Sequence, residues 1–237
     1  MNYIILLAGG SGTRMGNTAV PKQFLELKDK PIIIYSIENA LKCKLIDKII
    51  IACNSQYIDM LKKMVSKYKL SDSVHITNGG TNRLLSTCSG ISYIIKNFGI
   101  TQKDIFIAHD SVRIFTNERI FRENIQNANI YGAATTVYAL EETIVKAGAD
   151  GLLYKAYARE NRFSGQSPQT FNLQKFIINF SMLSTEQKNT FTDLSEVFFA
   201  NNEKVFPVIG DKENIKITTP FDLILAEKRL ANKKQED

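Results

Sequence analysis

The sequence has no long apolar segment. None of the hydrophobic runs in its 237 residues approaches the roughly 18 apolar residues that a membrane-spanning helix needs. The first run, MNYIILLAGG, follows no basic region, since Met1 and Asn2 are uncharged in their side chains, and it ends at glycines instead of a small-residue cleavage site. We therefore expect a buried first strand in a cytoplasmic protein that does not act at a membrane.

Cysteine and histidine are scarce. Cys43, Cys53 and Cys88 are odd in number, widely spaced and without C-x-x-C pairing, which argues against a disulfide framework and against a zinc site. The only histidines are His75 and His109, so few imidazoles are present for general acid–base catalysis.

Basic residues outnumber acidic ones, with 30 Lys and Arg against 24 Asp and Glu and a formal charge of +6. Such an excess is compatible with a nucleic acid, an anionic membrane, a small acidic ligand or a merely solvated surface. The cations are spread along the chain, and the densest cluster, EKRLANKKQED, also contains acidic residues. Binding of single-stranded nucleic acid requires aromatic residues interleaved with cations. This sequence does not interleave them, so we expect no nucleic-acid partner.

Strand-like and helix-like segments alternate over the first 140 residues. The strand-like segments are residues 3–8, 47–53, 73–77, 104–110 and 131–140, and the helix-like ones are 31–44, 57–68, 83–98 and 117–128. This order predicts an α/β fold with a mostly parallel, twisted sheet and helical crossovers. Ligands bind such folds at the carboxyl ends of the strands, where residues 6–24 and 109–113 are expected to meet.

The alternation changes after residue 140. The segment EETIVKAGADGLLYKAY has two alternating runs around a turn with Gly148 and Gly151, which is typical of a protruding β-hairpin. A last helix is expected to begin near Thr219, where Pro220 suits the first turn and Asp222 favours the helix dipole. Without repeats or low-complexity linkers, we predict one domain over 1–237 with a hairpin arm at about 141–158.

The stretch LLAGGSGTRMGNTAVPKQF, residues 6–24, is rich in glycine. It lacks the Gly-Lys pair of a P-loop, and Met15 occupies the position of the third glycine in a dinucleotide fingerprint. Glycines nevertheless allow backbone N–H groups to approach phosphate oxygens, and Arg14 and Lys22 add two cations that a dinucleotide site does not require. The stretch predicts a triphosphate ligand whose charge changes during a reaction.

Six motifs in order, spanning nearly the whole chain, resemble one enzyme family. They are LAGGSGTRMG, PKQF, GGTNRLLS, HDSVR, GQSPQTF and NIKITTPFDL. Each is weak alone, but the set is similar to the cytidylyltransferases that activate small sugar-alcohol phosphates with CTP. Two branches are close: the ribitol-5-phosphate cytidylyltransferases of teichoic acid and capsule precursor synthesis, and the 2-C-methyl-D-erythritol 4-phosphate cytidylyltransferases of isoprenoid synthesis. The first, fourth and fifth motifs favour the ribitol branch.

The resemblance implies a Rossmann-like three-layer sandwich of the nucleotide-diphospho-sugar transferase type and a homodimer to which the arm contributes. It also implies in-line attack of a sugar-alcohol phosphate on the α-phosphorus of CTP. That phosphate is largely dianionic at neutral pH, so no general base is needed. CTP would be held by Leu7, Ala8, Gly9, Gly10, Gly80, Thr81, Asn82, Arg83, Ser86 and Ser111.

The remaining roles also follow from the resemblance. Arg14 and Lys22 would be catalytic, stabilising charge on the pentacoordinate phosphorus and on the leaving pyrophosphate. Arg159 and Lys216 would bind the phosphate of the sugar alcohol, with help from Thr143 in the arm.

Asp110 would hold Mg²⁺, because this ion needs only one or two protein carboxylates beside phosphates and water. Taken singly, each of these residues has an ordinary structural alternative. Asp110 could cap a loop, Lys216 could be a solvated lysine, and Arg159 could form a salt bridge within the hairpin.

The sequence departs from the family pattern at two positions. Ile114 stands where the family usually has proline, and Ser167 replaces a common threonine. Two other functions stay open, a nucleic-acid-binding or regulatory module without turnover and a nucleotidyltransferase for NDP-sugars. The motifs GQSPQTF and NIKITTPFDL favour sugar-alcohol phosphates over both.

Overall fold

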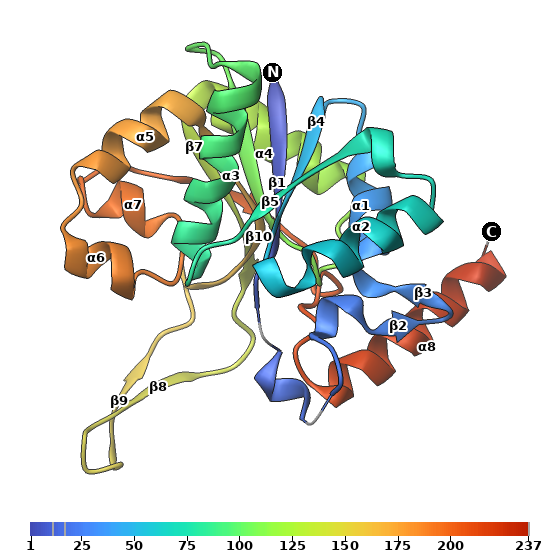
Figure 1. The fold of residues 1–237 in the computed structure, drawn as a ribbon. Coiled ribbons are helices and arrows are strands. Elements are labelled where there is room, and N and C mark those ends of the chain that lie inside the picture. Colours follow the sequence, from blue (N-terminus) through green and yellow to red (C-terminus); the bar gives the residue numbers. More distant parts are fainter. Residues whose placement is uncertain (11, 17, 237) are drawn as a thin grey trace.

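The computed structural model describes residues 1–10, 12–16 and 18–236. Its centre is a seven-stranded sheet in the order β11-β7-β10-β6-β1-β4-β5 (Figure 1). The strands are β1 (Asn2–Ala8), β4 (Lys48–Cys53), β5 (Val74–Asn78), β6 (Ile105–Asp110), β7 (Ala133–Ala139), β10 (Phe163–Asn172) and β11 (Phe206–Ile209). All neighbours pair in parallel except β10, which is antiparallel to both β6 and β7. The predicted mostly parallel α/β sheet is confirmed.

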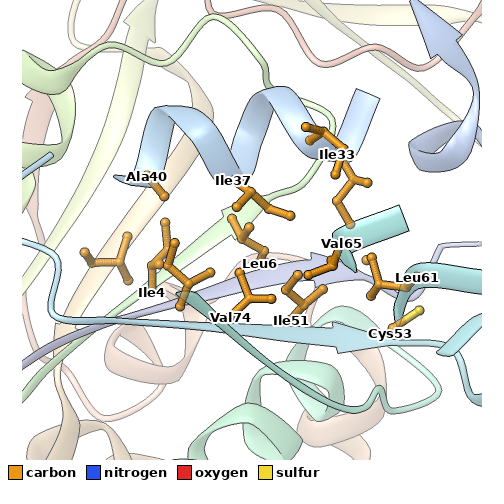
Figure 2. Packing of buried hydrophobic residues seen from close by; sticks show 14 of the residues in the cluster. Ile4, Leu6, Ile33, Ile37, Ala40, Ile51, Cys53, Leu61, Val65 and Val74 are labelled. Atoms are coloured by element: carbon orange, nitrogen blue, oxygen red, sulfur yellow. The ribbon is translucent and has the colours of Figure 1, made fainter. Parts of the chain in front are cut away.

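Helices cover both faces of this sheet. Helices α1 (Ile32–Lys42), α2 (Ile58–Lys67) and α4 (Glu118–Tyr131) contribute to one buried cluster with Ile4 and Leu6 of β1, part of which Figure 2 shows. Helices α3 (Arg83–Phe98), α5 (Leu173–Ser181) and α7 (Glu196–Phe199) contribute to the other, with Tyr3 and Ile5. Successive residues of a strand point to opposite faces. Because helices cover both faces of the sheet, β1 has no polar residue between Ile4 and Ala8. The three-layer prediction is confirmed.

Strands β10 and β11 were not predicted from the sequence. The segment GQSPQTF within β10 contains glycine, serine and proline, which are typical of turns. The pairing of β10 with β7 shifts register between Gly165 and Gln169, and Pro168 lies within this irregularity, where a missing N–H is tolerated. As a consequence, β10 lies between β6 and β7 and brings residues 166–169 next to the carboxyl end of β6.

Shorter elements complete the chain. They are β2 (Glu26–Leu27), β3 (Lys30–Pro31), α6 (Thr185–Thr190), α8 (Pro220–Glu236) and the 3₁₀ turns η1 (Thr13–Met15), η2 (Lys22–Phe24), η3 (Ser55–Tyr57) and η4 (Ser71–Ser73). Helix α8 begins as expected, because the Thr219 backbone N–H and hydroxyl both donate to Asp222, at 2.8 and 2.9 Å. Among the described helices, none is long and apolar enough to cross a membrane.

The hairpin consists of β8 (Ile144–Ala147) and β9 (Leu153–Tyr157), which pair only with each other and project from the body (Figure 1). Gly151 occupies the turn with a φ of 81°, a conformation that favours glycine. Val145, Leu152 and Leu153 are exposed on this arm. Residues 141–158, which contain β8, β9 and the turn between them, are called the arm below.

Candidate functional site

A cleft of about 300 Å³ opens at the carboxyl ends of β1 and β6. It is lined by Leu7, Gly9, Gly10, Gly12, Arg14, Lys22, Gln23, Gly80, Thr81, Asn82, Arg83, Ser86, Asp110, Ser111, Val112 and Lys216. Every site residue predicted from the sequence lines it except Ala8, Thr143 and Arg159. The fold therefore gathers segments as far apart in the sequence as Leu7 and Lys216 around one space, as expected for a parallel sheet.

The glycine-rich loop is held in place by a residue that the sequence analysis did not single out. Gln23 is buried, and its side-chain amide donates to the carbonyls of Ala8 and Gly10 at 2.8 and 3.1 Å. Ala8 was predicted to hold CTP through its backbone, but its carbonyl already accepts the hydrogen bond from Gln23. Gly12 has a φ of 74°, and a Cβ on it would lie 3.1 Å from the backbone nitrogen of Lys22. The loop thus needs glycine to pack beside Lys22.

The GGTNRLLS motif forms the turn into α3. Ser86 hydroxyl accepts from the Gly80 N–H at 3.0 Å and donates to the Gly80 carbonyl at 3.2 Å, while Asn82 caps the helix by accepting from the Leu85 N–H. A Cβ on Gly80 would lie 2.5 Å from the backbone carbon of Leu85, so no larger residue fits there. The turn presses against the first turn of α3, whose free N–H groups favour negative charge.

Asp110 lies at the centre of the site and faces three cations. Arg83 contacts Oδ1, whereas Lys216 Nζ and Arg113 Nε lie 3.2 and 3.4 Å from Oδ2. Burial by itself would raise the pKa of Asp110, but Arg83, Lys216 and Arg113 outweigh burial and hold the pKa of this carboxyl well below its usual range. Asp110 is therefore ionised throughout the physiological pH range.

Strand β10 supplies hydrogen bonds that hold Asp110 and Arg83. The Asp110 backbone N–H donates to Ser167 Oγ at 3.0 Å, and Gln169 Oε1 accepts from Arg83 Nη2 at 3.1 Å. The amide nitrogen of Gln169 donates in turn to both carboxylate oxygens of Asp193, at 2.9 and 3.0 Å, which fixes its orientation. Ser167 keeps the hydroxyl that a threonine would offer, so this departure from the family pattern leaves the contact intact.

His109 lies behind Asp110 and is fully enclosed. Burial lowers the pKa of His109 to about 3, so the imidazole is neutral. Ser167 Oγ lies 3.0 Å from Nδ1 and the Arg113 carbonyl 3.3 Å from Nε2. The Arg113 carbonyl can only accept, so the neutral imidazole carries its proton on Nε2. Nδ1 then accepts from the Ser167 hydroxyl, whose oxygen also accepts the Asp110 N–H. His109 is placed to hold the turn after β6.

The cleft is strongly electropositive. Arg14, Lys22, Arg83 and Lys216 line it, and Asp110 is the only acidic residue among the described residues that do so. Burial, together with the neighbouring cations Lys216 and Arg14, lowers the pKa of Lys22 to about 8. A group of cations that repel one another binds a polyanion well, because the ligand relieves the repulsion.

Two predicted residues lie outside the cleft. Thr143 and Arg159 are exposed at the base of the arm, where Arg159 Nη1 donates to the Glu141 carbonyl at 2.6 Å. Neither forms part of the space enclosed by its own chain. The alternative that Arg159 forms a side-chain salt bridge in the hairpin does not hold either, since its partner is a backbone carbonyl.

Comparisons with known proteins agree on one family. The family model IspD, 2-C-methyl-D-erythritol 4-phosphate cytidylyltransferase, matches residues 2–232. A ribitol-5-phosphate cytidylyltransferase from Lactiplantibacillus plantarum is 39% identical over 226 residues, which cover 95% of this chain and 97% of that protein.

Solved structures show the same fold. The 4-diphosphocytidyl-2C-methyl-D-erythritol synthase of Anaerococcus prevotii has a TM-score of 0.79 and 26% identity, covering 97% of this chain and 96% of that one. The 2-C-methyl-D-erythritol 4-phosphate cytidylyltransferase of Francisella tularensis has a TM-score of 0.80 and 23% identity, covering 96% and 99%.

The charge of Lys22 makes anion binding pH-dependent. Because its pKa is lowered to about 8, Lys22 carries its positive charge below that pH and loses it above. We expect the affinity for inorganic pyrophosphate, measured by calorimetry, to fall relative to that of Lys22→Arg as the pH rises from 7 to about 9, since arginine stays charged. The protonation of pyrophosphate itself changes equally in the titrations of the wild type and of Lys22→Arg, so it cancels in the ratio of the two affinities. A constant ratio of the two affinities across this range would contradict the assignment.

Proposed function

The chain belongs to the 2-C-methyl-D-erythritol 4-phosphate cytidylyltransferase family, and within it we propose that the enzyme transfers CMP from CTP to D-ribitol 5-phosphate, giving CDP-ribitol and pyrophosphate. The observation that carries this choice of substrate is the 39% identity, over 95% of the chain, with a ribitol-5-phosphate cytidylyltransferase. The alternative acceptor is 2-C-methyl-D-erythritol 4-phosphate, which the family model and the solved structures name. Those structures are more distant in sequence, at 26% and 23% identity.

The reaction is a displacement at phosphorus. A phosphate oxygen of ribitol 5-phosphate attacks the α-phosphorus of CTP, the bond from that phosphorus to the bridging oxygen of the β-phosphate breaks, and pyrophosphate leaves with the electron pair. The attacking phosphate is largely dianionic at neutral pH, so the protein has no proton to remove. Its work is to position two polyanions and to stabilise charge. A cleft whose described lining residues include four cations and a single carboxylate suits that task.

The residues of the cleft divide into two subsites in this proposal. The glycine loop, the turn at Gly80 and Ser111 hold the nucleotide, with Arg14 and Lys22 directed to the triphosphate. Lys216 lines the same cleft, and we assign it to the phosphate of the sugar alcohol. Its Nζ lies 3.2 Å from Oδ2 of Asp110, whereas Arg83 contacts Oδ1.

Mg²⁺ fits the donor set at Asp110. This ion takes one or two protein carboxylates and completes its shell with water and substrate phosphates. The described residues hold no group of three or more His, Cys, Asp and Glu side chains that could form an all-protein cage, whereas Asp110 is ionised and borders the cleft. When bound, Mg²⁺ would neutralise part of the charge on the phosphates. Full turnover in the presence of EDTA would contradict a role for the metal.

A homodimer accounts for the exposed arm. An isolated two-stranded hairpin is marginally stable in water, and this one exposes Val145, Leu152 and Leu153. We propose that the arm packs on a second copy and carries Thr143 and Arg159 to the sugar-alcohol subsite of that copy. The enzyme would work in the cytoplasm, where CTP is available. A monomeric mass in solution together with full activity would refute the dimer.

The choice of acceptor predicts a substrate preference. With CTP and Mg²⁺, we expect release of pyrophosphate with ribitol 5-phosphate at a kcat/KM at least about 10-fold above that with 2-C-methyl-D-erythritol 4-phosphate, which is the discrimination that one or two acceptor contacts supply. A coupled pyrophosphate assay over a panel of alditol phosphates measures it. The reverse preference would assign the chain to isoprenoid synthesis.

The two lysines should affect different kinetic constants. Lys22 acts on charge that develops in the transition state, so Lys22→Ala is expected to lower kcat by about 10²-fold. Lys216 binds a charge already present in the ground state, so Lys216→Ala is expected chiefly to raise KM for ribitol 5-phosphate, by about 10-fold, and to leave KM for CTP unchanged. Steady-state kinetics with each substrate varied in turn measure both. A Lys216→Ala enzyme with weakened CTP binding and normal acceptor binding would reverse the subsites.

A further inference from the structure

Lys216 lies on a segment without helix or strand. Residues 210–219 join β11 to α8. A lysine on such a segment reaches a fixed place in the cleft only if the backbone is anchored on both sides of it. Ile217 is one anchor, because its N–H donates to the Val112 carbonyl at 3.1 Å and its side chain is fully buried.

Asn214 is the other anchor. Its side chain is fully buried and does not line the cleft. Its Oδ1 accepts from Thr116 Oγ1 at 2.8 Å, and its Nδ2 donates to the Ser167 carbonyl at 2.9 Å and to Gln166 Oε1 at 3.1 Å. One side chain thus joins the turn after β6, the middle of β10 and the segment that carries Lys216.

The backbone of Asn214 also reaches the charged cluster. Its carbonyl accepts from Arg113 Nη1 at 2.5 Å, while Arg113 Nε lies 3.4 Å from Asp110 Oδ2. The same carboxylate oxygen lies 3.2 Å from Lys216 Nζ. Arg113 and Lys216 therefore converge on one oxygen of Asp110, and the position of Asn214 determines how both approach it.

We propose that Asn214 is a positioning residue for the sugar-alcohol phosphate, which it affects through Lys216 without touching the ligand. The inference rests on the proposed function, in which Lys216 binds that phosphate. Hydrogen bonds depend on direction, so an amide with a partner at each polar atom restrains the segment more narrowly than an apolar side chain of the same size would. A small shift of the backbone at Asn214 would move Nζ of Lys216 away from the phosphate.

The test compares Asn214→Ala with Lys216→Ala and with the double variant. We expect Asn214→Ala to raise KM for ribitol 5-phosphate by about 10-fold and to change KM for CTP by less than about 2-fold. In the Lys216→Ala background, Asn214→Ala should raise KM no further, because residues that act through one another are not additive. Calorimetric titration with ribitol 5-phosphate gives the same comparison without turnover.

Asn179→Ala is the matched control. Asn179 is also a buried asparagine, and its Nδ2 donates to Glu203 Oε1 at 2.8 Å and to the Lys175 carbonyl at 3.0 Å. Neither Asn179 nor these two partners line the cleft. This variant should lower the melting temperature without changing either KM.

If Asn214→Ala does not fold, Thr116→Val removes the hydrogen-bond donor to Asn214 Oδ1 and should also raise KM for ribitol 5-phosphate.

The outcomes separate the two claims. If Lys216→Ala raises the acceptor KM but neither Asn214→Ala nor Thr116→Val does, the positioning role is wrong and the proposed subsite stands. If the effects of Asn214→Ala and Lys216→Ala multiply in the double variant, Asn214 does not act through Lys216. If Lys216→Ala leaves the acceptor KM unchanged, the subsite itself is wrong, and the inference falls with it.

Discussion

The carboxylate of Asp110, held between Arg83, Lys216 and Arg113, is the interaction on which the site depends. Removing charges from water is costly, and a buried ion pair is tolerated only when its geometry is good and its remaining atoms are hydrogen-bonded. Here one anion faces three cations, so positive charge remains in excess in the free protein. That excess positive charge attracts the two phosphate-bearing substrates, and Asp110 holds the cations in position before the substrates bind.

The insertion of β10 between β6 and β7 makes this arrangement possible. An uninterrupted parallel sheet would place a second parallel strand beside β6. The antiparallel strand instead extends past the carboxyl end of β6 and presents Ser167 and Gln169 there, where they hold the Asp110 backbone and Arg83. The same strand gives Asn214 its anchor at the Ser167 carbonyl. Fold and site are thus linked through Ser167 and Gln169 of one strand.

Hydrophobic periodicity was sufficient to predict β1, β4, β5, β6 and β7, the helices between them and the cleft at their carboxyl ends, because these depend on local pattern and on general topology. It did not reveal β11 or β10. Pro168 and Gly165 of β10 are typical of turns, and the place of β10 depends on pairing with distant strands. Gln23 and Gln169 occur within the motifs that mark the family, yet their roles could not be predicted, since hydrogen bonds between distant segments leave no periodic signal. Ile114 fills a buried apolar position, so proline is not required there by packing.

In the proposed mechanism, Asp110 competes with substrate phosphates for the cations of the cleft and also supports catalysis. Asp110→Asn keeps the shape of the side chain and removes its charge. Calorimetry with pyrophosphate in the absence of divalent metal should then show binding at least as tight as in the wild type, because Arg83 and Lys216 lose their internal anion, whereas turnover with CTP and ribitol 5-phosphate should fall by about 10²-fold or more. Loss of pyrophosphate binding in parallel with turnover would show that Asp110 only maintains the structure, and would contradict this account.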